Sequence, residues 1–384
     1  MYYEIFFMRY KFILFFVLLF TIPHLTKAET KNIDIQTLSL DSLLLNTEVD
    51  LRINYGFFVH HHFDMKSYPA DFPMFELSFQ KQTYGRSEWQ SYFNYPTIGV
   101  SAFYSNLGNI DILGKAYAVY PFISFPFNKS KINTFGFRFG VGLAYLTEKF
   151  HHTENYKNTS IGNNLNAAIS LTFEYKRQIA DRYKISFFAG LTHFSNGCSN
   201  FPNSGYNIIN AGISGTYLLN EPKNYITRET SHNKNFKKIV PEYYVGLSYG
   251  VKRIKYQQKE NVTVYDLEFY VMDRISNLSK VGLGMDLVYN KCSYISVREY
   301  YSRTFTFIEM LKPSIGLAYE LTMGEASFLI NFGYHIYGRD MSGGRWYQKL
   351  GFKINIGDHA YAKVALNTHF GVADFLGWGL GIRL

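Results

Sequence analysis

The sequence lacks the features that mark many classes of protein. It has no phosphate-binding loop, no nucleic-acid-binding module and no cofactor fingerprint, so neither a cofactor nor a nucleic-acid partner is expected. It has two cysteines, and no cysteine or carboxylate spacing predicts a defined metal site. It also lacks a linker rich in proline or serine. After residue 28, no apolar run is long enough to predict a transmembrane helix.

The first 28 residues have the pattern of a secretory signal peptide. Arg9 and Lys11 precede an apolar run over residues 12–20, and the small residues Thr26 and Ala28 precede a cleavage point. The apolar run is shorter than the roughly 20 residues that a membrane-spanning helix needs, which argues against an anchor. We expect export, removal of residues 1–28, and a mature chain of residues 29–384. Removal would lower the net charge from +9 to +7.

The sequence is rich in aromatic residues and in stretches where apolar side chains alternate with polar or small ones. There are 33 Tyr and 35 Phe against 3 Trp, and mean hydropathy is near zero. Apolar side chains alternate with polar or small ones over residues 49–57, 135–145 and 376–384. Such strands have one apolar and one polar face, as a transmembrane β-barrel requires, and barrel closure leaves no unpaired backbone in lipid. A secreted β-sandwich also explains the alternation, but it does not explain the aromatic content.

The fold class predicted is all-β, a transmembrane antiparallel barrel of about 16 strands. Eight strands are expected in residues 48–219 and eight in 241–384, separated by a polar, basic loop over 220–240. LTHF at 191–194 and NTHF at 367–370 make the halves look like a degenerate repeat. Two tandem eight-stranded barrels are therefore the alternative. One barrel is preferred, because only the C-terminus carries a terminal amphipathic strand. The strands are expected near these residues: 48–58, 72–82, 96–106, 112–127, 133–147, 163–178, 183–195, 205–219, 241–256, 262–273, 279–290, 312–322, 326–337, 345–357, 360–370 and 375–384.

Residues 192–207, THFSNGCSNFPNSGYN, contain the candidate active site. His193 and Ser195 continue the face that Ile185, Phe187, Ala189 and Leu191 begin, so both are expected on the lipid-facing wall near the extracellular rim. The parity of the next strand places Asn207 on the same wall. A histidine can accept the proton of a serine nucleophile, and a third group can orient the ring. Backbone N–H groups around Gly197, or the side chains of Asn196 and Asn203, could stabilise an oxyanion.

This segment resembles the active-site region of the PagL-like lipid A deacylases, which are eight-stranded outer-membrane serine esterases. His193, Phe194, Ser195 and Asn196 match the family pattern, as do Asn203 and Gly205. The resemblance implies that His193 is the general base and Ser195 the nucleophile. It also implies lipid A, or lipopolysaccharide, as substrate and the bacterial outer membrane as location. The family has a glutamate fourteen residues after the histidine, where this chain has Asn207. The chain length and the ending THFGVADFLGWGLGIRL resemble the longer acyloxyacyl hydrolase-type relatives of Bacteroidetes.

Other readings remain open at the level of sequence. The protein could be a non-enzymatic porin or small-solute channel with a degenerate site. The histidines at 60–62 and 151–152 are expected in solvated loops, and His369 is expected to face the lumen, where a contact with Asp374 is possible. Cys198 and Cys292 map to extracellular ends and could form a disulfide. The net positive charge suits a surface that meets phosphorylated lipid A. The acyl chain cleaved and the oligomeric state stay open.

Overall fold

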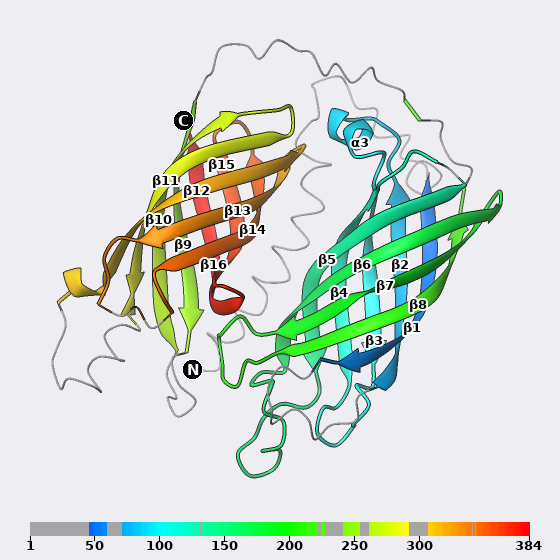
Figure 1. Cartoon of the computed structure of the whole chain (residues 1–384), viewed down its shortest axis with the longest axis horizontal. Coiled ribbons are helices and arrows are strands. Elements are labelled where there is room, and N and C mark those ends of the chain that lie inside the picture. The colour runs from blue at the N-terminus through cyan, green and yellow to red at the C-terminus, as the bar shows by residue number, and fades with distance from the viewer. Residues whose placement is uncertain are drawn as a thin grey trace, which may run out of the picture. The chain divides into compact units, whose positions relative to one another are not determined.

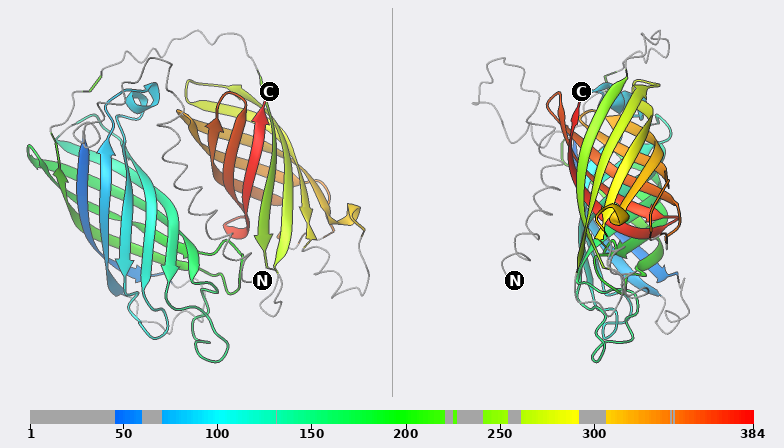
Figure 2. Two further views of the ribbon diagram at one scale, coloured as in Figure 1. Left: turned by 180° about the vertical axis from the view of Figure 1, so that it is seen from behind. Right: turned by 90° about the vertical axis from the view of Figure 1, so that its left-hand side faces the viewer.

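The computed structural model describes two compact units of the chain, which divide between residues 232 and 233. The described residues are 46–59, 71–130, 132–220, 225–226, 241–253, 261–291, 306–339, 341 and 343–384. Each unit is a closed barrel of eight strands (Figure 1). Neighbouring strands are antiparallel throughout, and Figure 2 shows their tilt around each barrel from two further sides. No helix among the described residues is long and apolar enough to cross a membrane.

The first barrel contains strands β1 to β8, in which each strand pairs with the next and β8 pairs back to β1. Their bounds are β1 Thr47–Phe58, β2 Asp71–Gln82, β3 Thr97–Ser105, β4 Ala116–Pro126, β5 Asn133–Leu146, β6 Leu165–Ala180, β7 Tyr183–Ser195 and β8 Tyr206–Leu218. A short helix, α3 Glu88–Tyr92, lies in the connection between β2 and β3.

The second barrel contains strands β9 to β16 and closes through a pairing of β16 with β9. The bounds are β9 Glu242–Lys252, β10 Val262–Arg274, β11 Ser279–Asn290, β12 Leu311–Met323, β13 Ala326–His335, β14 Trp346–Ile356, β15 Ala360–His369 and β16 Val372–Arg383. A 3₁₀ turn, η3 Ile308–Met310, precedes β12. All sixteen strands lie within a few residues of the bounds that the alternation predicts.

The preferred prediction of one continuous barrel is wrong, and the tandem alternative holds. Register explains the difference: Leu51 of β1 lies opposite Gly215 of β8, and Leu380 of β16 lies opposite Leu247 of β9. Each half therefore uses its own last strand to satisfy the edge of its own first strand. Among the described strands, no edge is left unpaired, and the terminal strand β16 closes the second barrel by pairing with β9.

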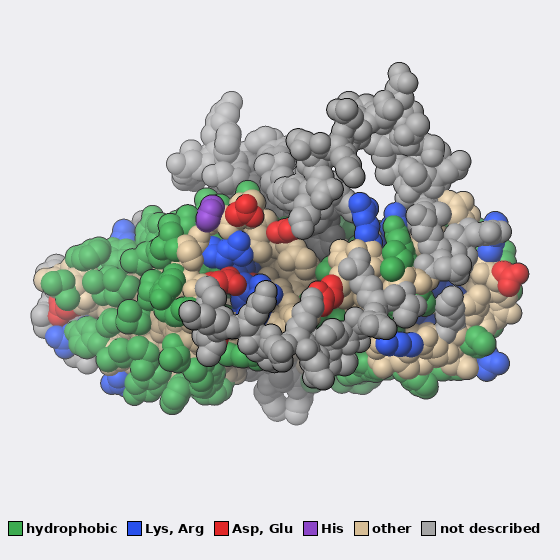
Figure 3. Space-filling model, turned by 90° about the horizontal axis from the view of Figure 1, so that it is seen from above, with side chains coloured by type: hydrophobic (Ala, Val, Ile, Leu, Met, Phe, Trp, Pro, Cys, Tyr) green, Lys and Arg blue, Asp and Glu red, His purple; other side chains and the backbone are tan. Residues whose placement is uncertain are grey.

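Each strand separates an apolar outer face from an inner face that is mainly polar. In β1, Leu51, Ile53 and Tyr55 point outward and are about half exposed, whereas Arg52 and Asn54 are buried. Figure 3 shows the result at one end of the second barrel, where hydrophobic side chains cover the outer wall around charged and polar side chains. The pattern matches that of a barrel whose outer wall meets lipid.

Charged side chains from different strands cross the lumen of each barrel. In the first, Arg52 of β1 binds Glu174 of β6 at 2.6 Å and Asp50 at 2.7 Å. Arg138 of β5 lies 3.4 Å from Glu76 of β2. All of these groups are at least nine-tenths buried, so each charge depends on its partners to offset its desolvation. The barrel interior is thus filled by paired charges at this level.

The second barrel has a lysine at the centre of its own lumenal network. The Lys349 ammonium lies 2.5 Å from Asp266, 2.7 Å from Glu268 and 2.9 Å from Asp286. The three carboxylates come close enough together to hold a metal ion. They surround an ammonium instead, which compensates their charge without an ion. Lys363 contacts Glu268 as well.

Candidate active site

His193 and Ser195 lie on the outer wall of the first barrel, at the end where β7 finishes and β8 begins. Thr192 and Phe194, which alternate with them on β7, are almost fully buried and face the lumen. His193 and Ser195 are half-buried on the opposite face, in line with the outward-facing Phe187 and Leu191. The alternation of the strand therefore places both polar residues on the wall that the sequence pattern predicts.

Asn207 of β8 is the direct cross-strand neighbour of His193. The two residues are paired in register, and the Asn207 side-chain oxygen lies 2.6 Å from Nδ1 of His193. An amide oxygen is an acceptor, so Nδ1 carries the hydrogen of this bond. Nε2 is then the basic nitrogen of the neutral ring. The pair fixes both the orientation and the tautomer of the imidazole.

The imidazole of His193 packs against Gly205. A Cβ atom at Gly205 would come within 2.8 Å of Cε1 and 3.5 Å of Nε2 of His193, and Gly205 has a φ of +75°. Any side chain here would clash with the ring as well as strain the backbone. The β7–β8 pairing continues from His193–Asn207 to Phe194–Tyr206, where it ends. The ring therefore packs against Gly205 at the end of the hairpin at which Ser195 finishes β7.

Ser195 is the last residue of β7, and the small Ala167 of β6 lies beside it in register. Residues two apart on one face of a strand are separated by roughly 6.7 Å. Ser195, His193 and Asn207 thus occupy one patch of the outer wall.

The loop after Ser195 holds the three predicted oxyanion candidates. The Asn203 side-chain oxygen accepts the backbone N–H of Asn196 at 2.8 Å, so these two groups are committed to each other. The side-chain nitrogen of Asn196 is buried and has no hydrogen-bond partner, although its oxygen accepts the N–H of Asn200 at 3.2 Å. A buried amide donor without an acceptor is uncommon. Gly197 is buried in the same turn, with a φ of +60°.

A second loop, between β5 and β6, contacts the candidate active-site loop, which is the segment 196–205 after Ser195. Asn200 donates to the carbonyl oxygen of Gly162 at 2.7 Å, and the N–H of Gly205 donates to Ser160 O at 3.1 Å. Gly162 has no space for a side chain, because a Cβ atom would lie 2.4 Å from the carbonyl oxygen of Phe201. These contacts anchor the active-site loop at several points along its length.

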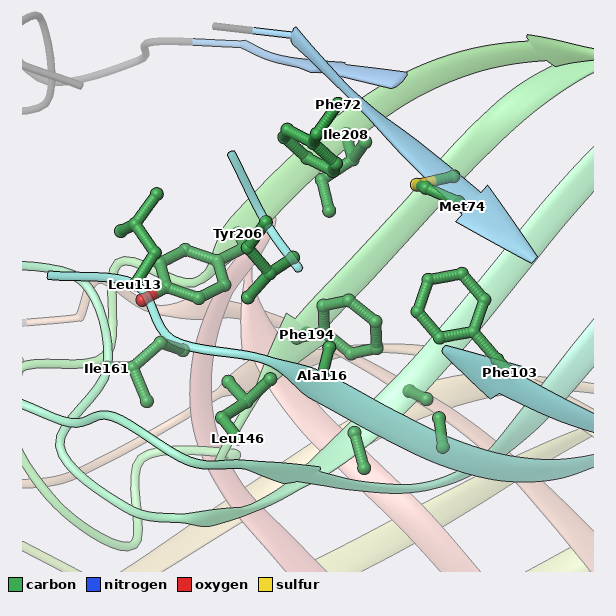
Figure 4. Close-up of a cluster of buried hydrophobic side chains, with 14 of the residues drawn as sticks. Phe72, Met74, Phe103, Leu113, Ala116, Leu146, Ile161, Phe194, Tyr206 and Ile208 are labelled. Carbon is green, nitrogen blue, oxygen red and sulfur yellow. The ribbon is translucent and has the colours of Figure 1, made fainter. Parts of the chain in front are cut away.

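A hydrophobic cluster fills the lumen directly behind the site (Figure 4). Phe194 lies between His193 and Ser195 in sequence, and Tyr206 and Ile208 flank Asn207; all three are 0% exposed. Their side chains pack inside the barrel with residues from other strands, and the Phe194 ring centroid lies 5.7 Å from that of Phe103. Close packing on the inner face restrains the two strands that carry polar groups on the outer face.

The remaining sequence predictions have mixed outcomes. His369 does line a lumenal pocket in the second barrel, and its Nε2 lies 3.8 Å from Asp374. His151 and His152 lie in the loop between β5 and β6, with ring centroids 4.8 Å apart. The signal peptide, the histidines at 60–62 and Cys292 lie outside the described residues, so the disulfide with Cys198 stays a prediction. No sequence pattern signals the close approach of Gly205 to His193.

Comparison with known proteins relates each half of the chain to a family. Residues 74–216 match the family model described as Lipid A 3-O-deacylase (PagL), and residues 241–384 match the model described as Acyloxyacyl hydrolase, C-terminal domain. No curated protein matches the chain.

Several solved structures of barrel proteins are similar at low identity. The β domain of the Bordetella autotransporter BrkA is 8% identical, with 88% of this chain and 98% of that chain covered and a TM-score of 0.24. A mutant porin of Rh. blastica is 8% identical, with coverages of 88% and 99% and a TM-score of 0.19.

Proposed function

The chain belongs to the PagL-like family of outer-membrane lipid A deacylases, and we propose from this premise that its first barrel is a serine esterase. Its substrate is an acyl ester of lipid A in the leaflet that surrounds the site. The observation that carries this proposal is the 2.6 Å contact between His193 Nδ1 and Asn207, next to Ser195 on the outer wall. A site on the outer wall can meet an ester that lies among lipid chains.

The chemistry follows from the orientation of the ring. Nε2 of His193 accepts the proton of Ser195 as Oγ attacks the ester carbonyl, and it then delivers that proton to the departing alcohol. Water hydrolyses the acyl-enzyme in a second step with the same base. The buried Asn196 side-chain nitrogen is the donor best suited to the oxyanion, because the structure gives it no other acceptor. Asn207 orients the ring but contributes no full charge to the imidazolium.

The alternative function, a solute channel, is disfavoured because buried ion pairs cross the lumen of each barrel. Arg52 and Glu174 cross the first barrel, and Lys349 and its three carboxylates cross the second. A solute would have to break buried ion pairs, each of which costs several kcal/mol to separate. We therefore expect low conductance from purified protein in planar bilayers.

A single substitution tests the esterase. Refolded Ser195→Ala protein, mixed with lipid A in detergent micelles, should lose at least about a thousandfold in deacylation rate, as read by the mass of the lipid product. Ser186→Ala is a matched control, because Ser186 lies on the lumenal side of β7 and its hydroxyl has no hydrogen-bond partner. Heat-modifiable mobility reports that both variants fold. Full activity in Ser195→Ala would refute the assignment.

A further inference from the structure

The candidate active-site loop shares a closed network of hydrogen bonds with the loop between β5 and β6. Three members of the network lie in the candidate active-site loop, directly after Ser195. The fourth, Asn163, lies in the other loop, just before β6 begins. In order around the network, the members are Asn196, Asn200, Asn163 and Ser199.

One side of the network determines how the Asn196 side chain is turned. Its Oδ1 accepts the backbone N–H of Asn200 at 3.2 Å. Only the oxygen of an amide can accept an N–H, so this bond also determines where the nitrogen points. Asn200 is held in turn by the other loop, because its Nδ2 donates to Gly162 O at 2.7 Å and to Oδ1 of Asn163 at 3.0 Å. The orientation of the Asn196 amide therefore depends on contacts that begin outside its own loop.

The other side of the network holds the backbone of Asn196. Nδ2 of Asn163 donates to Oγ of Ser199 at 3.2 Å, and that hydroxyl donates to the carbonyl oxygen of Asn196 at 2.9 Å. A hydroxyl can accept one hydrogen bond while it donates another, so each group has a role that its chemistry allows. Asn163 thus reaches Asn196 by two routes, one to the side chain and one to the backbone.

The Asn196 side-chain nitrogen is the one group that this network orients without using. It is buried and has no hydrogen-bond partner among the described residues. Asn196 directly follows Ser195, so its amide belongs to the segment next to the proposed nucleophile. A donor that is oriented before the reaction begins stabilises a developing oxyanion without a cost of reorientation. A displacement of about 1 Å can cost about a hundredfold in rate, so the residues that hold such a donor matter.

We propose that Asn163 is a positioning residue of the esterase, which acts on the Asn196 amide through Asn200 and Ser199. This inference rests on the proposed function and adds to it a residue from a second loop. The oxyanion forms only as Ser195 attacks, so an oriented donor stabilises the transition state and not the bound ester. Loss of Asn163 should therefore lower kcat and leave KM nearly unchanged.

Steady-state kinetics of the full-length protein with lipid A in detergent micelles test this role. Asn163→Ala should lower kcat at least about tenfold and change KM less than about twofold. Asn164→Ala is the matched control, because this neighbour also donates two hydrogen bonds, but to Leu146 O at 2.8 Å and Thr147 O at 3.1 Å at the end of β5. It should keep the wild-type kcat, and heat-modifiable mobility reports that both variants fold. Equal kcat values in the two variants would overturn the proposal.

A double-mutant cycle shows whether Asn163 acts through Asn196. Asn196→Ala alone removes the donor and should lower kcat about a hundredfold or more. Addition of Asn163→Ala should then lower kcat by less than about a further twofold, because residues that act as one unit are not additive. A further tenfold loss in the double variant would refute the role through Asn196, since a general loosening of the two loops would add to the loss of the donor.

Ser199→Ala keeps the network testable if Asn163→Ala fails to fold. It opens the network but retains the bond from Ser199 N–H to Asn196 O at 3.2 Å, so kcat should fall about threefold to fivefold, and a wild-type kcat would overturn the proposal. Ser195→Ala separates this inference from the proposed function. If Ser195→Ala is inactive while Asn163→Ala keeps the wild-type kcat, the esterase stands and the positioning role fails. If Ser195→Ala is fully active, both fail.

Discussion

Asn207→Asp should make the enzyme faster, because it exchanges a neutral orienting group for a charged one at the same place. Asparagine and aspartate have the same shape, so a carboxylate oxygen would take the position now 2.6 Å from His193 Nδ1. During attack by Ser195 the imidazole becomes positively charged. A carboxylate stabilises this charged ring, whereas an amide only holds it in orientation.

The distance between the two charges sets the size of the expected rise in kcat/KM for Asn207→Asp. Two unit charges about 4–5 Å apart interact by about 3–4 kcal/mol at an effective dielectric constant near 20. His193 and Asn207 are half-buried on the outer wall, so screening reduces this to about 1.5–2 kcal/mol. We therefore expect kcat/KM to rise about tenfold to thirtyfold. Asn207→Ala should lower it about fivefold, since it removes one hydrogen bond worth about 1 kcal/mol.

The assay is the initial rate of lipid A deacylation across a range of pH. The added negative charge favours protonated His193 and raises its pKa, so the acidic limb of the kcat/KM profile should move to higher pH. Asn106→Asp is the matched control, because Asn106 accepts a hydrogen bond from Gly108 N–H in another loop and faces no catalytic group. An unchanged rate and an unchanged pH profile in folded Asn207→Asp protein would refute the proposed role of Asn207.

Two further substitutions follow from the packing. Gly205→Ala should reduce the deacylation rate at least about tenfold while the barrel still folds. The reason is that the added Cβ atom would lie 2.8 Å from His193 Cε1 and would displace the ring. Wild-type activity in this variant would show that the ring has room to move. Arg52→Met should destabilise the first barrel by about 3–5 kcal/mol, because Glu174 and Asp50 would lose a buried partner. Urea unfolding in micelles measures this loss, and an unchanged midpoint would mean that Lys176, 2.7 Å from Glu174, compensates the charge.

Local information in the sequence was enough to predict the strands and the face of each side chain. Alternation has a period of two along a strand, so it can be read without knowledge of the partners. The interval 183–195 predicted for β7 is the interval observed, and Phe194 faces inward while His193 and Ser195 face outward. The candidate residues could be found in the same way, because they lie within one hairpin whose strands pair directly.

Only the tertiary structure decided how the strands close and which distant residues meet. Alternation is the same in one barrel of sixteen strands and in two of eight, because the difference lies in whether β1 pairs with β8, and that contact joins residues far apart in sequence. The same holds for Lys252 of β9 and Asp374 of β16, whose ion pair forms because β16 pairs back to β9. Barrel closure brings together side chains that no local pattern relates, because the pairs that close each barrel join strands far apart in sequence.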